Sequence, residues 1–271
     1  QVPKAVQACN KLINRDKVFA FIVSIGTPMN NACFPSQMQA GVPSLFPITA
    51  ARSMYEPLHK LKFQANASYV DQVRAGVNYM VKEKGKKAVC VMYQDTDFGK
   101  EVFEGVQMQA EKLGIKIVET TTHKPTDQDF SAPITKLRQA KCDLVVMGTI
   151  VRDSIIPYAT ARKMGWNDVD FLGSSATYDV AVAAAQGTEG LYTMGLVEMP
   201  YADSPNEAMR TFVAQYKEKY GQMPNIGAVY GYTAADITVA ALDKAGPNLT
   251  VDSFVKAMES IKGFRDRFGG V

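Results

Sequence analysis

Cys90-Val91-Met92-Tyr93-Gln94-Asp95-Thr96-Asp97-Phe98-Gly99-Lys100-Glu101 is the stretch of the sequence that decides the fold. The apolar run Ala88–Tyr93 predicts a buried parallel strand, and the amphipathic stretch from about Phe98 to Leu113 predicts a helix. Polar residues fill the turn between them. A strand that ends just before a helix places such a turn at the carboxyl edge of a parallel sheet, where open α/β sheets bind ligands.

The same strand-turn-helix unit recurs along the chain and predicts an α/β fold with doubly wound parallel sheets. We expect strands at Val18–Val23, Ser44–Pro47, Ala88–Tyr93, Lys116–Thr121, Leu144–Gly148, Asp170–Gly173 and Leu191–Leu196. We expect helices at Lys4–Asn14, Asn30–Ala40, Tyr69–Lys84, Lys100–Leu113, Ala132–Gln139, Ser154–Met164, Val180–Ala185, Asn206–Tyr220, Ala228–Ala245 and Val251–Ile261.

Two interruptions in this alternation predict that the chain crosses between two lobes. The extended piece Lys60–Ser68 precedes a helix, and the Pro-punctuated connection Val197–Pro205 joins a strand to a polar helix. The block between them has enough strands for a complete lobe, whereas the outer blocks have to join each other across the chain. We therefore expect one lobe from residues 1–66 plus 201–271, a second from residues 67–200, and a hinge at the crossings.

Composition and charge exclude several classes of partner. The 271 residues are 46% hydrophobic, and 30 Lys+Arg are nearly balanced by 27 Asp+Glu. The one basic cluster, Lys82–Lys87, lies at a predicted helix end, so we expect no nucleic-acid partner. No apolar run approaches the ~18 residues that cross a membrane. The chain opens at Gln1 without a signal peptide and stops soon after a Gly-Gly turn, so we expect it to be the middle of a longer protein.

The four cysteines have no zinc-site spacing. Cys90 and Cys142 lie in or beside apolar strand runs, where we expect buried free thiols. Cys9 and Cys33 fall on neighbouring predicted helices. They are either free thiols or, in an oxidising compartment, a disulfide.

No catalytic constellation is visible in the sequence, so we expect neither an enzyme nor a cofactor or metal. The only histidines, His59 and His123, are expected at the surface, and Gly173-Ser174-Ser175 has no partner base. Nucleophile-elbow, dinucleotide-binding and P-loop motifs do not occur. Asp95 and Asp97 are expected to cap a helix rather than to bind a metal.

Small polar groups instead gather at predicted strand ends. Hydroxyls and free backbone N–H groups at helix starts suit a carboxylate or another anionic group, and nearby aromatic rings suit an apolar body. The polar groups are Gly26-Thr27-Pro28, Ile48-Thr49-Ala50, Asp97-Phe98-Gly99, Thr149–Arg152 and Ser174-Ser175, and the rings are Tyr69, Phe98, Tyr178, Tyr230 and Tyr232.

Several blocks of the sequence, in this order, resemble the leucine/isoleucine/valine-type periplasmic solute-binding proteins of ABC transporters. The blocks are Val18–Val23 with Gly26-Thr27-Pro28, Gly41-Val42-Pro43 with Pro47-Ile48-Thr49-Ala50, Tyr93–Lys100, Asp129-Phe130-Ser131, Asp143–Gly148 and Phe171-Leu172-Gly173-Ser174. The resemblance covers essentially the whole chain. It implies the type I periplasmic binding fold, with two Rossmann-like lobes that close on a ligand, and an incomplete first lobe here.

The resemblance also implies which residues contact the ligand. Thr27, next to Pro28, takes the position of a hydroxyl that meets a ligand carboxylate, and Ile48, Thr49 and Ala50 take the position of a backbone-binding loop. Phe98, with Tyr69 close by, is the implied aromatic wall. Ile150, Ser175 beside Ser174, and the pair Val229 and Tyr230 take the remaining positions, and Arg152 is a further candidate to hold a carboxylate or to point into solvent.

One departure from the family pattern directs the functional prediction. Amino-acid binders of this family place an acidic side chain near position 175, where this chain has Ser175. A desolvated ammonium without an acidic partner is unfavourable. We therefore expect a periplasmic, monomeric binding protein that holds a small organic acid, such as an aromatic acid, and delivers it to a membrane permease.

Other functions remain open. The chain is alternatively an amino-acid binder whose acidic partner is Asp153 or Asp179. A second alternative is a ligand-sensing domain of a regulator or receptor, since such proteins share the scaffold.

Overall fold

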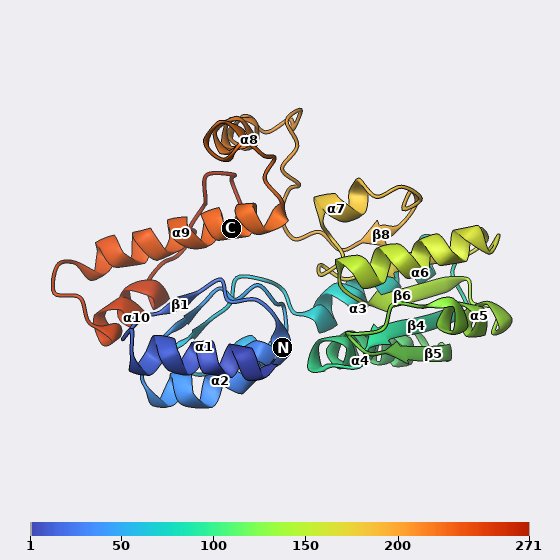
Figure 1. The fold of residues 1–271 in the computed structure, drawn as a ribbon, viewed down its shortest axis with the longest axis horizontal. Helices are drawn as coiled ribbons and strands as arrows, with labels where there is room; N and C mark the ends of the chain where they lie inside the picture. Colours follow the sequence, from blue (N-terminus) through green and yellow to red (C-terminus); the bar gives the residue numbers. More distant parts are fainter. Residues whose placement is uncertain (1, 271) are drawn as a thin grey trace. The chain divides into compact units, whose positions relative to one another are not determined.

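Residues 2–270 are described by a computed structural model, in which the chain divides into two units (Figure 1). Unit 1 contains the described residues up to Asn66 and those from Val197 onward, and unit 2 is Ala67–Leu196. Each unit contains its own parallel sheet covered by helices, so the chain is an α/β protein as expected from its alternating pattern.

Unit 2 is built on a five-stranded parallel sheet with the strand order β5-β4-β6-β7-β8. The strands are β4 (Val89–Gln94), β5 (Ile117–His123), β6 (Leu144–Gly148), β7 (Asp170–Gly173) and β8 (Tyr192–Thr193). Helix α3 (Tyr69–Lys82) precedes β4, and the helices that connect the strands are α4 (Asp97–Leu113), α5 (Ser131–Gln139), α6 (Val151–Lys163) and α7 (Val180–Ala183). The central strands β4 and β6 are almost wholly buried, which is why their sequences are continuously apolar.

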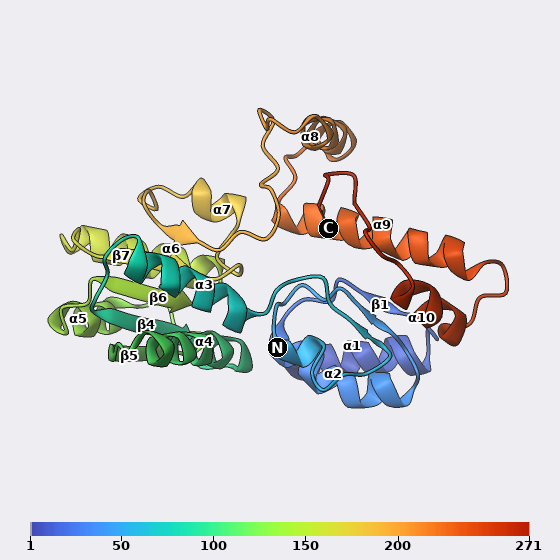
Figure 2. The same cartoon turned by 180° about the vertical axis from the view of Figure 1, so that it is seen from behind.

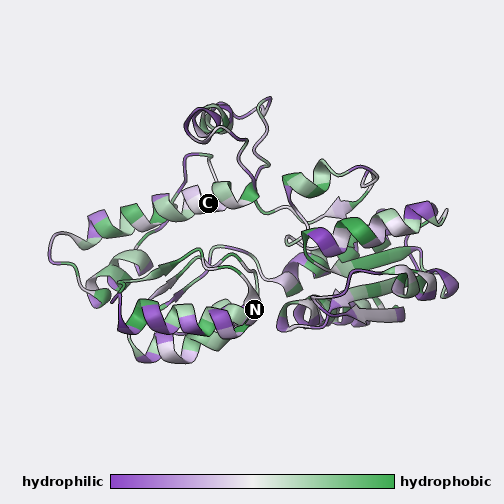
Figure 3. Ribbon diagram, in the orientation of Figure 1, coloured by the Kyte–Doolittle hydropathy of each residue, from purple (hydrophilic) through white to green (hydrophobic). Residues whose placement is uncertain are grey.

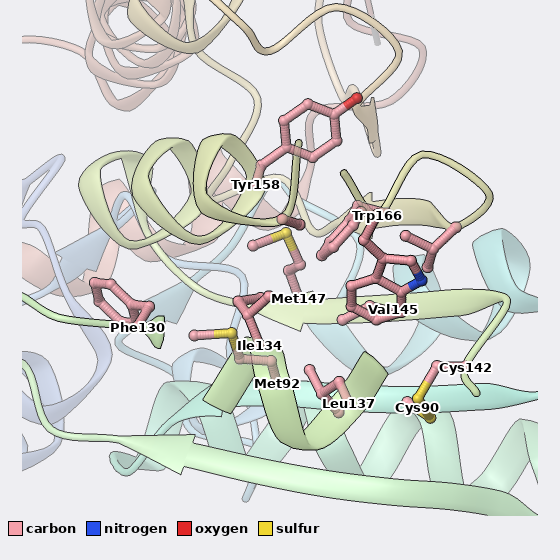
Figure 4. Close-up of a cluster of buried hydrophobic side chains, with 13 residues drawn as sticks. Cys90, Met92, Phe130, Ile134, Leu137, Cys142, Val145, Met147, Tyr158 and Trp166 are labelled. Carbon is pink, nitrogen blue, oxygen red and sulfur yellow. A yellow bond between two sulfur atoms is a disulfide. The ribbon is translucent and has the colours of Figure 1, made fainter. Parts of the chain in front are cut away.

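Helices cover both faces of this sheet. On one face α3 and α4 contact each other and pack against β4 and β6, as the reverse view in Figure 2 shows. On the other face α5 and α6 enclose a buried cluster that includes Ile134, Tyr158, Trp166 and Phe171 (Figure 4). The two layers fix the strand ends that carry the candidate ligand groups.

The prediction of free thiols at Cys90 and Cys142 is wrong. Cys90 lies in β4 and Cys142 two residues before the adjacent strand β6, and the two form a disulfide inside the buried cluster (Figure 4). Adjacent strands bring together cysteines that are 52 residues apart in the sequence. Of the two open alternatives for Cys9 and Cys33, the structure has the disulfide.

Unit 1 has a smaller parallel sheet with the order β1-β2-β3. Its strands are β1 (Phe21–Ile22), β2 (Ser44–Leu45) and β3 (Lys62–Phe63), and its helices are α1 (Val2–Asn14), α2 (Thr27–Gln39), η1 (Arg52–Met54), α8 (Glu207–Tyr220), α9 (Ile226–Ala245) and α10 (Val251–Glu259). Helix α1 alternates hydrophilic and hydrophobic residues (Figure 3) and buries Cys9 and Ile13 against α2. Leu45 of β2 packs with the helices α9 and α10.

Some element boundaries differ from the predictions. The expected strand Val18–Val23 contains only Phe21–Ile22, because Val23 has a positive φ of 51° that ends the extended conformation. Helices α2, α4 and α6 each begin three residues earlier than expected, at Thr27, Asp97 and Val151. The earlier starts place several candidate site residues in first helical turns. Among the described helices, none is both long and apolar enough to cross a membrane.

Candidate functional site

Two threonine hydroxyls lie together at the carboxyl ends of the unit 1 strands. The Oγ1 atoms of Thr27, at the start of α2, and Thr49, after β2, are 2.6 Å apart, and both residues are buried. A hydrogen bond between two hydroxyls uses one of their two protons. The second proton remains for an acceptor such as a carboxylate oxygen.

The loops that hold the two threonines are bonded to each other. Ile25 and Ile48 form an isolated parallel bridge, and the N–H of Gly26 donates to the carbonyl of Ile48. Gly26 has a φ of 95°, which only glycine adopts readily, and it turns the chain into α2, which begins at Thr27 and has Pro28 in its first turn. Ala50 is buried. The structure therefore brings Thr27, Pro28, Ile48, Thr49 and Ala50 into one loop cluster.

The other unit 1 candidates lie at the start of α9. Val229 is 1% exposed and packs with Met209 and Val213 of α8. Its side chain belongs to the core of unit 1, so we leave Val229 out of the proposed ligand contacts. Tyr230 is half-buried beside it.

In unit 2, two aromatic rings from the first turns of α3 and α4 pack against each other. The rings of Tyr69 and Phe98 meet edge to face with their centroids 4.8 Å apart, and both residues are 5% exposed. Gly99 permits this arrangement, because a Cβ there would lie 2.0 Å from the carbonyl oxygen of Gln94. The start of α4 is consequently pressed against the end of β4.

Ser174 and Ser175 follow β7 in a tight turn. Ser174 is fully buried, and its Oγ accepts a hydrogen bond from the N–H of Ala176. Ser175 is half-buried, and its N–H donates to Oε1 of Gln72, 3.0 Å away on α3. The N–H of Ser175 is therefore already bonded, and only its side chain remains a candidate for a ligand contact.

Ile150 and Arg152 lie at the start of α6. Ile150 is 43% exposed. Arg152 donates from Nε to Oδ1 of Asp153 (2.6 Å) and from Nη2 to the carbonyls of Pro125 (2.9 Å) and Asp127 (3.1 Å). The guanidinium is bonded within its own unit while the side chain stays 43% exposed, so we leave Arg152 out of the proposed ligand contacts.

The prediction of a surface histidine at position 123 is wrong. His123 ends β5, is 4% exposed, and places Nε2 3.1 Å from Oδ2 of Asp153, which also accepts from Gln94 Nε2 at 3.1 Å. Asp153 itself is fully buried. Burial alone raises the pKa of the Asp153 carboxyl, but hydrogen bonds from His123, Arg152 and Gln94 outweigh burial and lower its pKa below the ordinary value of 3.8.

This cluster was not predicted, although the sequence contains one signal for it. Thr121 and His123 are two positions apart in β5 and are both buried, as expected for residues on one face of a strand. The cluster also bears on the two acidic candidates for an ammonium partner. Asp153 already accepts three hydrogen-bonding partners, and Asp179 caps α7 by accepting from the N–H of Ala181 at 2.8 Å. Within the described residues, no group of His, Cys, Asp and Glu side chains is arranged to hold a metal ion.

Comparison with known proteins identifies related sequences. A family model described as "Periplasmic binding protein" matches residues 1–271. Curated relatives include the Leu/Ile/Val-binding protein homolog 8 of Brucella abortus, 22% identical over 212 residues, which are 73% of this chain and 52% of the relative. The chain thus spans about half the length of the curated relatives it matches.

Solved structures share the fold. A fatty acid ABC transporter substrate-binding protein from Thermomonospora curvata has a TM-score of 0.88 at 26% identity and is matched over 100% of this chain and 70% of its own. A solute-binding protein from R. palustris in complex with benzoate has a TM-score of 0.84 at 19% identity, over 99% and 74%. A branched chain amino acid ABC transporter protein from Thermus thermophilus with bound valine has a TM-score of 0.87 at 21% identity, over 100% and 72%.

Proposed function

The chain belongs to the periplasmic binding protein family, and we propose that it binds a small organic acid without an α-ammonium group as the solute-binding component of an ABC transporter. This family consists of solute-binding transport proteins rather than enzymes. The proposed contacts are Thr27, Pro28, Ile48, Thr49, Ala50 and Tyr230 from unit 1 and Tyr69, Phe98, Ile150, Ser174 and Ser175 from unit 2.

The observation that carries the proposal is that the acidic side chains considered as ammonium partners already accept hydrogen bonds from other groups. An ammonium removed from water requires an anionic partner. Position 175 is a serine, the Asp153 carboxylate is buried with three partners, and the Asp179 carboxylate caps a helix. A carboxylate, in contrast, finds the hydroxyl pair of Thr27 and Thr49 at the start of α2.

A second candidate is an amino-acid binder. The curated relatives are named for leucine, isoleucine and valine, and one structural neighbour holds valine. In that case the ammonium needs a group other than Asp153 or Asp179, or requires one of them to give up a present hydrogen bond.

A thermal-shift screen with benzoate, octanoate, isovalerate and L-valine tests the proposal. A solute at 100 times its dissociation constant adds about 2.7 kcal/mol to the free energy of unfolding. We expect stabilisation by one of the three acids and none by L-valine. Stabilisation by L-valine alone would favour the amino-acid candidate, and no stabilisation by any of the four would contradict the proposal for these solute classes.

We propose that the protein lies in the periplasm and that its partner is a membrane permease. We also propose that it functions as a monomer. Both pairs of cysteines form disulfides, which persist in oxidising compartments. Size-exclusion chromatography with light scattering checks the monomer, and a dimer mass at micromolar concentration would contradict it.

A further inference from the structure

Two glutamines lie on either side of the junction where the chain passes from unit 1 to unit 2. Unit 1 ends its first segment at Asn66, and unit 2 begins at Ala67. Gln64 precedes the junction and Gln72 follows it in the first turns of α3. Each of them bonds to the junction segment with one end of its amide and to a proposed binding loop with the other.

Gln64 makes these bonds within unit 1. Its Nε2 donates to the carbonyl oxygen of Thr49 at 2.6 Å, and its Oε1 accepts from the N–H groups of Ala65 (2.8 Å) and Asn66 (3.2 Å). Thr49 carries the hydroxyl that pairs with Thr27. The amide of Gln64 therefore connects the threonine loop to the last residues before the junction.

Gln72 makes the corresponding bonds within unit 2. Its Nε2 donates to the carbonyl oxygen of Ala67 at 2.7 Å, and its Oε1 accepts from the N–H of Ser175 at 3.0 Å. The residue is 3% exposed, so its bonds do not compete with bulk water. Ser175 is 103 residues away along the chain, and Gln72 connects its loop to the first residue after the junction.

We propose that Gln64 and Gln72 are positioning residues that tie the two solute-binding loops to the inter-unit junction, so that each loop keeps its binding conformation only while its glutamine bond is intact. This inference rests on the proposed function, which identifies the loops of Thr49 and Ser175 as solute-binding loops. Glutamine suits the role because its amide donates at one end and accepts at the other, whereas a carboxylate only accepts. All the bonds lie within single units, so the ties hold whatever the arrangement of the two units.

Amide hydrogen exchange tests the ties without any solute. In Gln72→Met, which keeps the length of the side chain but removes both bonds, we expect the Ser175 amide to exchange about three- to tenfold faster than in the wild-type protein. In Gln64→Met we expect the same change at the Asn66 amide. Wild-type exchange rates at both amides would overturn the proposal.

Matched variants separate positioning from a general loss of stability. Gln109→Met removes another buried glutamine of unit 2, whose Nε2 bonds to Asn78 at 3.2 Å, and Gln37→Met removes one of unit 1, whose Nε2 bonds to the carbonyl of Pro43 at 3.1 Å. Neither bonds to a proposed loop or to the junction. We expect both controls to leave the Ser175 and Asn66 amides unchanged, and acceleration equal to that in the test variants would overturn the positioning role.

Gln64→Glu separates the bond that Gln64 donates to Thr49 from the bond it accepts from Asn66. It also provides a test if Gln64→Met fails to fold. The carboxylate still accepts from the Asn66 amide but cannot donate to Thr49, and Gln64 is only half-buried, which lets water solvate the charge. We expect the Asn66 amide to stay protected while solute affinity falls. Unchanged affinity would overturn the loop side of the tie.

Titration calorimetry measures that affinity with benzoate, octanoate, isovalerate or L-valine, whichever stabilises the wild-type protein. We expect the dissociation constant to rise about three- to tenfold in Gln64→Met and Gln72→Met relative to the two controls. Equal constants in test and control variants would overturn the proposal. If none of the four solutes binds the wild-type protein, the proposed function fails for them, while exchange at Ser175 and Asn66 still decides whether the ties exist.

Discussion

At the scale of single residues, the proposed carboxylate contact depends on the hydroxyl of Thr27. Thr27→Val keeps the shape of the side chain but removes one of the two paired hydroxyls and its hydrogen bond to Thr49. We expect binding of the solute found in the screen to weaken by about 1–2 kcal/mol, measured by titration calorimetry. Thr122→Val, at an exposed position of β5, is the control, and equal affinity in both variants would exclude the contact.

The side chain of Ser175 decides between acids and amino acids in our proposal. Ser175→Glu supplies the acidic group that an ammonium requires, so we expect affinity for L-valine to rise relative to isovalerate, which lacks the ammonium. Competition calorimetry with the two compounds measures the ratio. Ser260→Glu adds the same charge at an exposed position of unit 1. A ratio unchanged by Ser175→Glu would show that this residue does not face the solute's α-carbon.

The buried carboxylate of Asp153 predicts a pH dependence of stability. The folded pKa of Asp153 lies below 3.8, so its ionised form stabilises the fold above that pH, and the contribution is lost as the pH falls through the folded pKa. We expect Asp153→Asn to lower the free energy of unfolding by about 1.5–3 kcal/mol at about pH 7 and by less at about pH 3. Urea denaturation at both pH values measures this, with Asp243→Asn at an exposed position as control. If Asp153→Asn destabilised the protein equally at both pH values, the lowered pKa of Asp153 would be contradicted.

At the scale of elements, the close contact between α4 and β4 depends on Gly99. A Cβ at this position would lie 2.0 Å from the backbone oxygen of Gln94, and backbone cannot move aside as a flexible side chain does. We expect Gly99→Ala to lower the free energy of unfolding by at least about 2 kcal/mol.

Gly231→Ala is the matched substitution with the opposite expected sign. Gly231 lies inside α9, and a Cβ there meets nothing within 4 Å. Alanine is favoured over glycine in a helix by about 0.8–1.0 kcal/mol, so this variant should be as stable as the wild-type protein or more so. Chemical denaturation of both variants is the measurement. Equal effects of the two substitutions would contradict the steric argument.

The sequence predicts elements best where burial is uniform. The bounds of β6 and β7 match the expected strands, because continuous apolar runs flanked by polar residues leave little choice of register. The unit 1 strands are two residues long and depend on tertiary contacts and on backbone angles such as that of Val23, which the side-chain pattern does not contain. The starts of α2 and α6 were predicted too late, since Gly26-Thr27-Pro28 and Thr149–Arg152 were interpreted as turns at strand ends.

The candidate site was predictable to the extent that strand ends define it. Because parallel strands end at one edge of their sheet, Thr27 and Thr49 are expected at the same edge, and their hydroxyls form a hydrogen bond in the structure. The ties through Gln72 and His123 were not predictable, because they join residues that are far apart in sequence and chemically ordinary when read one at a time. The disulfide between Cys90 and Cys142 was not predicted for the same reason, since predicting it requires knowledge of which strands are adjacent in the sheet.

At the scale of the whole molecule, each unit contains one disulfide, closed over 24 residues in unit 1 and 52 residues in unit 2. A disulfide that closes a loop of this length raises the free energy of unfolding by about 3–4 kcal/mol, because it lowers the entropy of the unfolded chain. Trp166, the only tryptophan, lies in the core of unit 2 and reports that unit alone. We expect Cys90→Ala with Cys142→Ala to move the urea midpoint of Trp166 fluorescence downward by the corresponding amount.

The unit 1 pair provides the control for this prediction. Cys9→Ala with Cys33→Ala should leave the Trp166 transition in place, because the disulfide it removes is in the other unit. Equal shifts from the two double variants would show that the units unfold as one cooperative body, contrary to our expectation.

Pairing of all the cysteines has a practical consequence. Because the described chain offers no free thiol, a maleimide dye added to the folded protein has nothing native to react with. Single cysteines introduced at exposed helical positions, such as Gln107 on α4 and Glu259 on α10, become the sole attachment points for a donor and an acceptor fluorophore. The native disulfides thereby allow the protein to be labelled at two chosen positions with no cysteine to remove first.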